Sequence, residues 1–454
     1  MAPAPVPGVL RLEFRQTLAL AIPVVMGELG WMSMGVVDTL MVGRVSAEAL
    51  GAISVGRVVF FTVIVFGMGL LLGLDTLVST AHGAGRPVEC RRYLTNGIYL
   101  SLLLSLPMTA TIWASASLMG YWGIDPEVLA LTGPYLKALA WGTAPLLLYT
   151  TFRRYMQAVS RPRPVMIALI SANLVNLVGN WVLVHGNLGA PALGAEGAGW
   201  STCIASTYLA LFLMASTWLL HREQSGDRPE GLRKLELKRL RQLISLGLPA
   251  ATQLVVEVGV FAAATALAAR LAPTALAAHQ IALTAASVTF MVPLGLSSAG
   301  AVRVGQARGR GDLAGAKRSG WVAIVLAAGF MLVAALVFLG APRFLVRMFT
   351  ADIEVIAIGI VLLRIAALFQ LFDGLQVAAT GALRGAGDTR RPLLWNLIGH
   401  WILGLPVGYY LCFIAGYGAA GLWVGWLVGL GVIGIVLLIE WWRRANNLEQ
   451  VSFP

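Results

Sequence analysis

The stretch ISLGLPAATQLVVEVGVFAAATALAAR, residues 244–270, decides the fold of this chain. It is apolar over most of its length and holds a single carboxylate, Glu257, near its middle. A helix of about 20 mostly apolar residues is long enough to cross a membrane. The stretch therefore predicts a transmembrane helix that carries one acid at membrane depth.

The composition of the whole chain agrees with this stretch. Hydrophobic residues make up 58% of the 454 positions and charged residues only 12%, whereas soluble domains are about half apolar and about 25% charged. Apolar runs recur along the chain with short charged connectors, so no room remains for a separate soluble domain. The first run, from about Thr17 to Val42, is too long for a secretory signal. We predict an all-α polytopic membrane protein.

Apolar length and helix-breaking residues predict twelve transmembrane helices. They cover residues 17–43, 49–80, 93–120, 128–151, 164–186, 196–220, 242–270, 275–302, 319–341, 353–382, 392–415 and 418–442. Several are longer than a bilayer requires, which predicts tilting or kinking.

Lys and Arg are distributed unevenly among the predicted connectors. The tails and every second connector hold 26 of the 33 cations, including Arg153 and Arg154 between the fourth and fifth helices. Cytoplasmic loops of membrane proteins carry the excess of Lys and Arg. We therefore expect both termini and the long loop 221–241 in the cytoplasm. The net charge of +12 then needs no nucleic-acid partner.

An internal repeat appears when the chain is shifted by 226 residues against itself. Pro23 then meets Pro249, and Arg44 meets Arg270. The shift spans six helices, an even number, which predicts two parallel repeats related by an axis along the membrane normal. The predicted parts are an N-terminal tail (1–14), an N-lobe (15–220), a cytoplasmic linker (221–241), a C-lobe (242–444) and a C-terminal tail (445–454).

Glycines recur at four-residue spacing in two of the predicted helices. The patterns are Gly69-x3-Gly73 and Gly421-x3-Gly425-x3-Gly429. Small residues at this spacing let helices approach closely, so we interpret these glycines as packing positions and not as ligand-binding positions.

Acidic residues inside the predicted spans are the candidates for function, because a charge at the bilayer centre costs about 2.5 to 3.5 kcal/mol on insertion scales. They are Glu28 and Asp38 in the first helix, Asp75 in the second, Glu257 in the seventh and Asp373 in the tenth. Glu257 and Asp373 are the deepest, whereas Asp75 lies near a helix end, where we expect it to be hydrated. Burial raises the affinity of a carboxylate for a proton, so such an acid can hold a proton, a metal cation or a cationic substrate.

Structural roles for these acids remain alternatives at this stage. Glu257 or Asp373 could instead form a buried pair with Lys137 or Arg364, and Asp38 could form an ion pair with Arg44. In the repeat, none of the three acids Asp38, Glu257 and Asp373 meets another acid. We therefore expect a symmetric scaffold with a one-sided coupling site in the second lobe, which Asp38 approaches from the first lobe.

Polar residues accompany the acids. Asn173, Asn176 and Asn180 lie at three- and four-residue spacing on one face of the fifth helix, and Gln280 lies in the eighth. The asparagines either line a cavity or form hydrogen bonds between helices.

The sequence lacks the common enzyme signatures. The sequence holds no P-loop, no HExxH and no GxSxG motif. The cysteines Cys90, Cys203 and Cys412 are far apart and fit no metal spacing. We expect neither catalysis nor a cofactor.

Six segments make the chain similar to the multidrug and toxic compound extrusion (MATE) family, most of all to its NorM-type bacterial members. They are VVDTLMVGRVSAEALGA, the loop AHGAGR with its echo GQARGRGD, LPAATQ, AAHQIAL and GALRGAGDTRRP. The resemblance runs from about Arg15 to Arg444. It implies two six-helix bundles, alternating access and export of cationic amphipathic drugs in exchange for Na⁺ or H⁺. It also implies a multi-pass protein of the bacterial inner membrane, embedded in lipid and monomeric.

The resemblance also implies roles for particular residues. Glu257 and Asp373 match the carboxylates that bind the coupling cation, including Na⁺ if sodium is the coupling ion, while Asp38, Gln280 and Asp373 match positions near the substrate. Further positions that could line the cavity are Glu28, Asn173, Asn176, Asn180 and Phe369. Some NorM-type sodium sites have tyrosine where this chain has Phe369, which leaves Na⁺ or H⁺ open. The DinF-like branch has aspartate where this chain has Asn180, which argues against a first-lobe cation site built on that residue.

The alternative from the same wider superfamily is a flippase for lipid-linked oligosaccharide or lipid II. Such proteins line their cavity with several cations. Only Lys137 and Arg364 are candidates for that here, so the antiporter is the preferred hypothesis.

Overall fold

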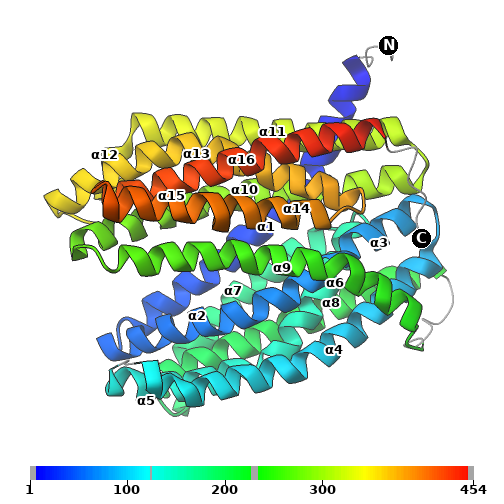
Figure 1. Ribbon diagram of the computed structural model, residues 1–454. Coiled ribbons are helices and arrows are strands. Elements are labelled where there is room, and N and C mark those ends of the chain that lie inside the picture. The colour runs from blue at the N-terminus through cyan, green and yellow to red at the C-terminus, as the bar shows by residue number, and fades with distance from the viewer. Residues whose placement is uncertain (1–6, 123–124, 226–233, 448–454) are drawn as a thin grey trace. The chain divides into compact units, whose positions relative to one another are not determined.

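The computed structural model describes residues 7–122, 125–225 and 234–447, and in these ranges it contains helices and no strand (Figure 1). The elements are α1 (Pro7–Val42), α2 (Ala47–Leu70), α3 (Gly73–Gly83), α4 (Pro87–Leu118), η1 (Met119–Trp122), α5 (Pro126–Trp141), α6 (Thr143–Ala158), α7 (Arg163–Leu183), η2 (Asn187–Gly189), α8 (Ala195–Ser225), α9 (Leu237–Ala268), α10 (Pro273–Gly309), α11 (Leu313–Gly340), α12 (Pro342–Arg347), α13 (Ile353–Gly385), α14 (Arg390–Leu397), η3 (Ile398–Gly404), α15 (Leu405–Tyr409), η4 (Tyr410–Ile414) and α16 (Ala419–Asn446). The predicted all-α class is confirmed.

Eleven helical stretches among the described residues are long and apolar enough to cross a membrane. They correspond to eleven of the predicted spans, and the exception is 128–151. That segment forms two shorter helices, α5 and α6, which meet at Gly142. Pro145 explains the break, because proline has no N–H to donate to the carbonyl four residues earlier and its ring clashes with that carbonyl. The N–H of Gly142 accordingly bonds to the carbonyl oxygen of Leu139, at 2.9 Å.

The end of the predicted fourth span also needs correction. Helix α6 continues to Ala158, so Arg153 and Arg154 lie within a helix and are buried. The expectation that Asp75 is hydrated was wrong as well. Asp75 is fully buried and forms an ion pair with Arg154, with 3.4 Å between Oδ2 and Nη1. A buried charge is tolerated when an opposite charge accompanies it.

The chain divides into two compact units. Unit 1 comprises Met1–Val25, Gly83–Gly85 and Thr252–Pro454, and unit 2 comprises Met26–His82 and Arg86–Ala251. The described part of α1 therefore contributes its first half to unit 1 and its second half to unit 2, while α9 begins in unit 2 and ends in unit 1. Pro23 and Pro249 each lie close to the change of unit. A proline inside a helix removes one backbone hydrogen bond there.

Helix α13 is the centre of unit 1. It packs against α10, α11 and α16, and Figure 1 shows α11, α13 and α16 side by side. The start of α1 is held to this unit by Glu13, whose Oε2 accepts from Arg303 Nη2 at 2.5 Å and from Ser319 Oγ at 3.2 Å.

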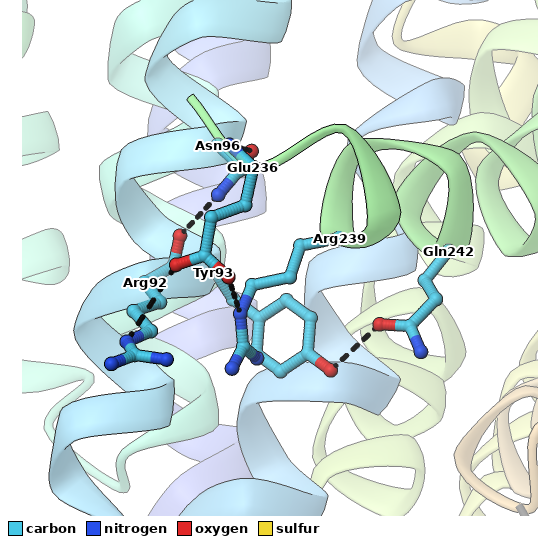
Figure 2. A network of polar contacts seen from close by, with 6 residues as sticks. All are labelled: Arg92, Tyr93, Asn96, Glu236, Arg239 and Gln242. Atoms are coloured by element: carbon cyan, nitrogen blue, oxygen red, sulfur yellow. Dashed lines mark hydrogen bonds and ion pairs between the residues drawn. The ribbon is translucent and has the colours of Figure 1, made fainter. Parts of the chain in front are cut away.

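In unit 2, helix α8 packs against α5, α6 and α7, and the start of α9 docks on α4 through a polar network (Figure 2). Glu236 lies between Arg92, at 3.6 Å, and Arg239, at 2.8 Å. The guanidinium of Arg239 lies over the ring of Tyr93, and the Tyr93 hydroxyl donates to Gln242 Oε1 at 3.0 Å. Of the predicted linker 221–241, residues 226–233 lie outside the described residues, and Leu237 already begins α9.

The glycine patterns are packing positions, as predicted. A Cβ atom on Gly425 would lie 2.5 Å from the carbonyl oxygen of Gly404, and one on Gly429 would lie 2.5 Å from the carbonyl oxygen of Gly399. Helix α16 therefore approaches η3 and α15 more closely than any side chain permits. In unit 2, a Cβ on Gly69 would lie 2.5 Å from the Cα of Ala251.

We predict that Gly425→Ala destabilises the protein by about 1 to 3 kcal/mol, because the added methyl group must push the helices apart. The measurement is the midpoint of denaturation of detergent-solubilised protein. Gly431→Ala, in the same helix but with no atom within 4 Å of the new Cβ, is the matched control and is expected to change little. Equal midpoints for the two variants would contradict this account of the interface.

Candidate functional site

The structure brings Glu257 and Asp373 together in unit 1. Glu257 lies in the second half of α9 and Asp373 in the middle of α13, and their charges interact. Asp373 is buried. Two carboxylates at this depth repel each other, so a proton or a metal cation bound between them would be stabilised. The sequence predicted these two acids as the coupling site, and that role stays a prediction.

Gln376 is a member of this group that the sequence analysis missed. Its Nε2 donates to Glu257 Oε1 at 3.3 Å, and its side chain has no exposed surface. It follows Asp373 by three residues, so both side chains project from the same face of α13. That spacing, in the segment DGLQ, was the available signal.

A π-helical segment, η3, holds the backbone of α9 beside Glu257. Trp401 Nε1 donates to the carbonyl oxygen of Val256 at 2.9 Å, and Gly259 lies against the Trp401 ring. Pro406 lacks the N–H that a regular helix would give to the carbonyl of Ile402, and π-helical turns of this kind are frequent near functional positions. The site is therefore built by three helical segments of one unit.

The structure places Asp38 in unit 2, where amides and a hydroxyl surround it. Its Oδ1 accepts from Asn180 Nδ2 at 2.7 Å and from Asn176 Nδ2 at 3.0 Å, while its Oδ2 accepts from Thr202 Oγ1 at 3.1 Å. Arg57 lies nearby and donates to the hydroxyl of Thr39 at 3.0 Å. The contacts of Asp38 are therefore to helices α7 and α8, and not the ion pair with Arg44 that the sequence left as an alternative.

The three asparagines of α7 all bond to the second half of α1. Asn176 and Asn180 reach Asp38, and Asn173 Nδ2 donates to the carbonyl oxygen of Gly30 at 2.9 Å. Between the two alternatives, these contacts support hydrogen bonding between helices.

Glu28 forms an ion pair with Arg153, and both side chains are buried in unit 2. Arg153 comes from α6 and Glu28 from α1. A paired carboxylate is already neutralised, so this contact supports a structural role for Glu28.

Among the described residues, neither Gln280 nor Phe369 makes a side-chain hydrogen bond, an ion pair or a ring contact with the acids. The side chain of Gln280 is exposed on α10. Phe369 is 3% exposed, and its ring packs against Trp423 with 5.5 Å between centroids. Phe369 is thus part of the unit 1 core.

His279, next to Gln280, belongs to a directional chain of hydrogen bonds. Trp423 Nε1 donates to His279 Nδ1 at 3.1 Å, so the proton of the neutral ring lies on Nε2, which donates to Thr265 Oγ1 at 3.1 Å. The Thr265 hydroxyl donates to the carbonyl oxygen of Phe261 at 2.9 Å. Each polar group has its partner, so this histidine fixes α9 against α10 and α16.

We predict that Thr265→Val destabilises the protein by about 1 to 3 kcal/mol, because it leaves the buried Nε2 proton of His279 without an acceptor. Thr284→Val is the control, since the Thr284 hydroxyl is exposed and bonds only to its own helix. Denaturation midpoints of both variants check the prediction, and a midpoint for Thr265→Val no lower than that of the control would refute it.

In the described ranges, no three His, Cys, Asp or Glu side chains lie together in a way that could hold a metal ion. A Na⁺ ion bound by Glu257 and Asp373 would therefore take its remaining ligands from other oxygen atoms.

Comparison with known proteins identifies the chain's relatives. The family model MatE matches residues 23–182 and 249–410. The probable multidrug resistance protein NorM of Mesorhizobium japonicum is 38% identical over 451 residues, with 98% of this chain and 96% of that protein covered. The protein of the same name from Bradyrhizobium diazoefficiens is 39% identical over 446 residues, with 96% and 94% covered.

A solved structure has the same fold. The crystal structure of the eukaryotic MATE transporter AtDTX14 matches with a TM-score of 0.86 at 20% identity, covering 97% of this chain and 99% of that one. At this identity the likeness concerns the fold alone. The family model and the curated relatives together extend over nearly the whole chain, and the chain therefore belongs to the MATE family of transporters, as a NorM-type member.

Proposed function

We propose that this protein is a secondary active multidrug efflux antiporter, which exports cationic amphipathic compounds in exchange for Na⁺ or H⁺ by alternating access. The observation that carries the proposal is the pair of acids on α9 and α13, the partly buried Glu257 and the buried Asp373, whose charges interact. The names of the curated relatives, multidrug resistance protein NorM, support efflux of drugs.

Competition at these acids supplies the coupling. A proton or Na⁺ bound at Glu257 and Asp373 neutralises the repulsion between them, whereas a cationic drug near Asp373 offers the same neutralisation. If the two cations bind the same carboxylate in turn, the entry of one releases the other. We propose that Asp38, Gln280 and Asp373 contribute to drug binding. No cofactor is required.

We further propose twelve transmembrane helices in two parallel lobes, with α5 and α6 together forming the fourth crossing. Three observations support the repeat. The two family-model matches begin 226 positions apart, at residues 23 and 249, and end 228 apart, at 182 and 410. The change of compact unit in α1 occurs between residues 25 and 26, and that in α9 between residues 251 and 252, again a shift of 226.

Equivalent contacts give the third support for the repeat. Glu13 at the start of α1 bonds to Ser319 in α11, and Arg239 at the start of α9 lies over Tyr93 in α4. The shift of 226 relates Glu13 to Arg239 and Tyr93 to Ser319. The predicted lobes 15–220 and 242–444, the linker 221–241 and the two tails remain our proposal for the domain organisation.

The proposed location is the bacterial inner membrane, with both termini in the cytoplasm and the protein acting as a monomer. The uneven distribution of Lys and Arg supports the cytoplasmic position of the termini. The bias remains when the buried Arg153 and Arg154 are left out of the count. The flippase remains the alternative, with Lys137 and Arg364, whose side chains are exposed, as its two candidate cavity cations.

Transport by purified protein in liposomes tests the proposal. A fluorescent organic cation should accumulate against its gradient when either a proton gradient or a sodium gradient is imposed alone, and the effective gradient identifies the coupling ion. No transport under either gradient, together with movement of lipid-linked headgroups between leaflets, would favour the flippase instead.

A further inference from the structure

The side chain of Gln376 is only half satisfied. It is fully buried, and its Nε2 donates to Glu257 Oε1, yet its Oε1 is buried without a hydrogen-bond partner. A buried acceptor without a donor costs about 1 to 3 kcal/mol. An unsatisfied group in a native structure requires an explanation, and here it lies beside the two acids.

The neighbours of this amide suggest what its oxygen binds. Gln376 donates to Glu257, and it follows Asp373 by three residues, so both side chains project from the same face of α13. The amide oxygen therefore belongs to the same part of unit 1 as the two carboxylates. Hard cations are bound by oxygen ligands, including carboxylates and amide carbonyls. The described residues offer no third acid or histidine there, so the amide oxygen is the available additional ligand.

We propose, on the basis of the proposed function, that Gln376 is a further ligand of the coupling cation held by Glu257 and Asp373. Its carbonyl oxygen binds Na⁺ directly or, when H⁺ is the coupling ion, accepts the proton of the Glu257 carboxyl group after the amide has turned by half a rotation. In both cases the amide of Gln376 supplies an uncharged oxygen atom that binds the cation.

An amide suits this position because it is donor and acceptor at once. While Glu257 is ionised, the NH₂ group donates to the carboxylate, as in the structure. When Glu257 is protonated, the carbonyl can accept the new O–H. A lysine or arginine could only donate and would hold Glu257 in its ionised form, whereas a leucine would satisfy neither form. Gln376 therefore gives Glu257 a hydrogen-bond partner both when the cation is bound and when it is released.

The test measures how transport rate depends on the coupling cation in Gln376→Leu liposomes. One arm varies Na⁺ at fixed pH and the other varies pH at fixed Na⁺. In the arm that drives transport, the half-saturating concentration should rise about tenfold, equivalent to 1.4 kcal/mol, while the maximal rate is largely kept. A structural role alone would lower the amount of folded protein without moving the half-saturating concentration.

Two further variants complete the experiment. Gln370→Leu is the matched control, because Gln370 is also fully buried in α13 with an unpartnered Oε1 but donates to Thr289. It should leave the half-saturating concentration unchanged. Gln376→Glu preserves the shape and the oxygen ligands, so if Gln376→Leu does not fold, this variant must still shift the dependence on the cation.

The failure of this inference is distinguishable from that of the proposed function. An inactive Glu257→Gln together with unchanged cation dependence in the Gln376 variants would overturn the inference and leave the antiporter intact. Wild-type transport by both Glu257→Gln and Asp373→Asn would overturn both. A shift in Gln370→Leu equal to that in Gln376→Leu would also count against a specific role for Gln376.

Discussion

Glu257→Gln is expected to abolish cation-driven export, with a fall in transport rate of about 100-fold. The substitution keeps the size of the side chain and a hydrogen bond to Gln376 but removes the negative charge that attracts the coupling cation. Interactions of a charged group are worth about 1.5 to 3 kcal/mol, and about 2.8 kcal/mol corresponds to a factor of 100 in affinity. The measurement is uptake of an organic cation by liposomes under the gradient that drives the wild type.

Asp373→Asn is expected to have an effect of similar size, because it removes the second charge of the same pair. Glu354→Gln is the control, since Glu354 is an exposed acid at the start of the same helix, and its variant should transport normally. Wild-type transport by both Glu257→Gln and Asp373→Asn would exclude these acids as the coupling site.

Apolar length predicted eleven of the membrane helices because burial in lipid acts on each run independently of the rest of the chain. The fourth span differs because Pro145 lies inside its apolar run and interrupts the helix. The mean hydropathy of a segment does not register the loss of one backbone N–H. Pro145 was visible in the sequence, but whether a proline interrupts a helix depends on how the neighbouring helices pack around it. Gly142, at that break, lies against Cys203 of α8.

The acids inside apolar runs were visible in the sequence, whereas their partners were not, and Asp75 is buried although it lies near the predicted end of its span. Glu257 and Asp373 stand alone in apolar runs, which indicates function whatever lies around them. The amide of Gln376 could be assigned only when the structure showed which of its atoms is bonded. The sequence suggested that Arg153 and Arg154 lie in a loop, because two adjacent cations after an apolar run usually mark the end of a span. The anions that pair with them come from distant segments, Glu28 from α1 and Asp75 from α3.

Glu28→Gln is expected to destabilise the protein by about 3 to 5 kcal/mol, because it leaves the buried guanidinium of Arg153 without its anion. Arg153 is 3% exposed and Glu28 is 8% exposed, so water replaces little of the lost interaction. The measurement is the denaturation midpoint in detergent, together with transport per folded molecule. We expect the stability to fall while the dependence of transport on the coupling cation stays that of the wild type.

The double variant Glu28→Met/Arg153→Met separates a structural pair from a functional acid. Replacing a buried ion pair by apolar side chains of similar volume is often neutral or stabilising, whereas removing one partner is costly. The double variant should therefore regain most of the stability that Glu28→Gln loses. If it is stable but fails to transport, Glu28 or Arg153 takes part in transport and the one-sided coupling site is wrong. If it is stable and active, the charges of unit 2 at this position serve the scaffold, and coupling depends on the acids of α9 and α13.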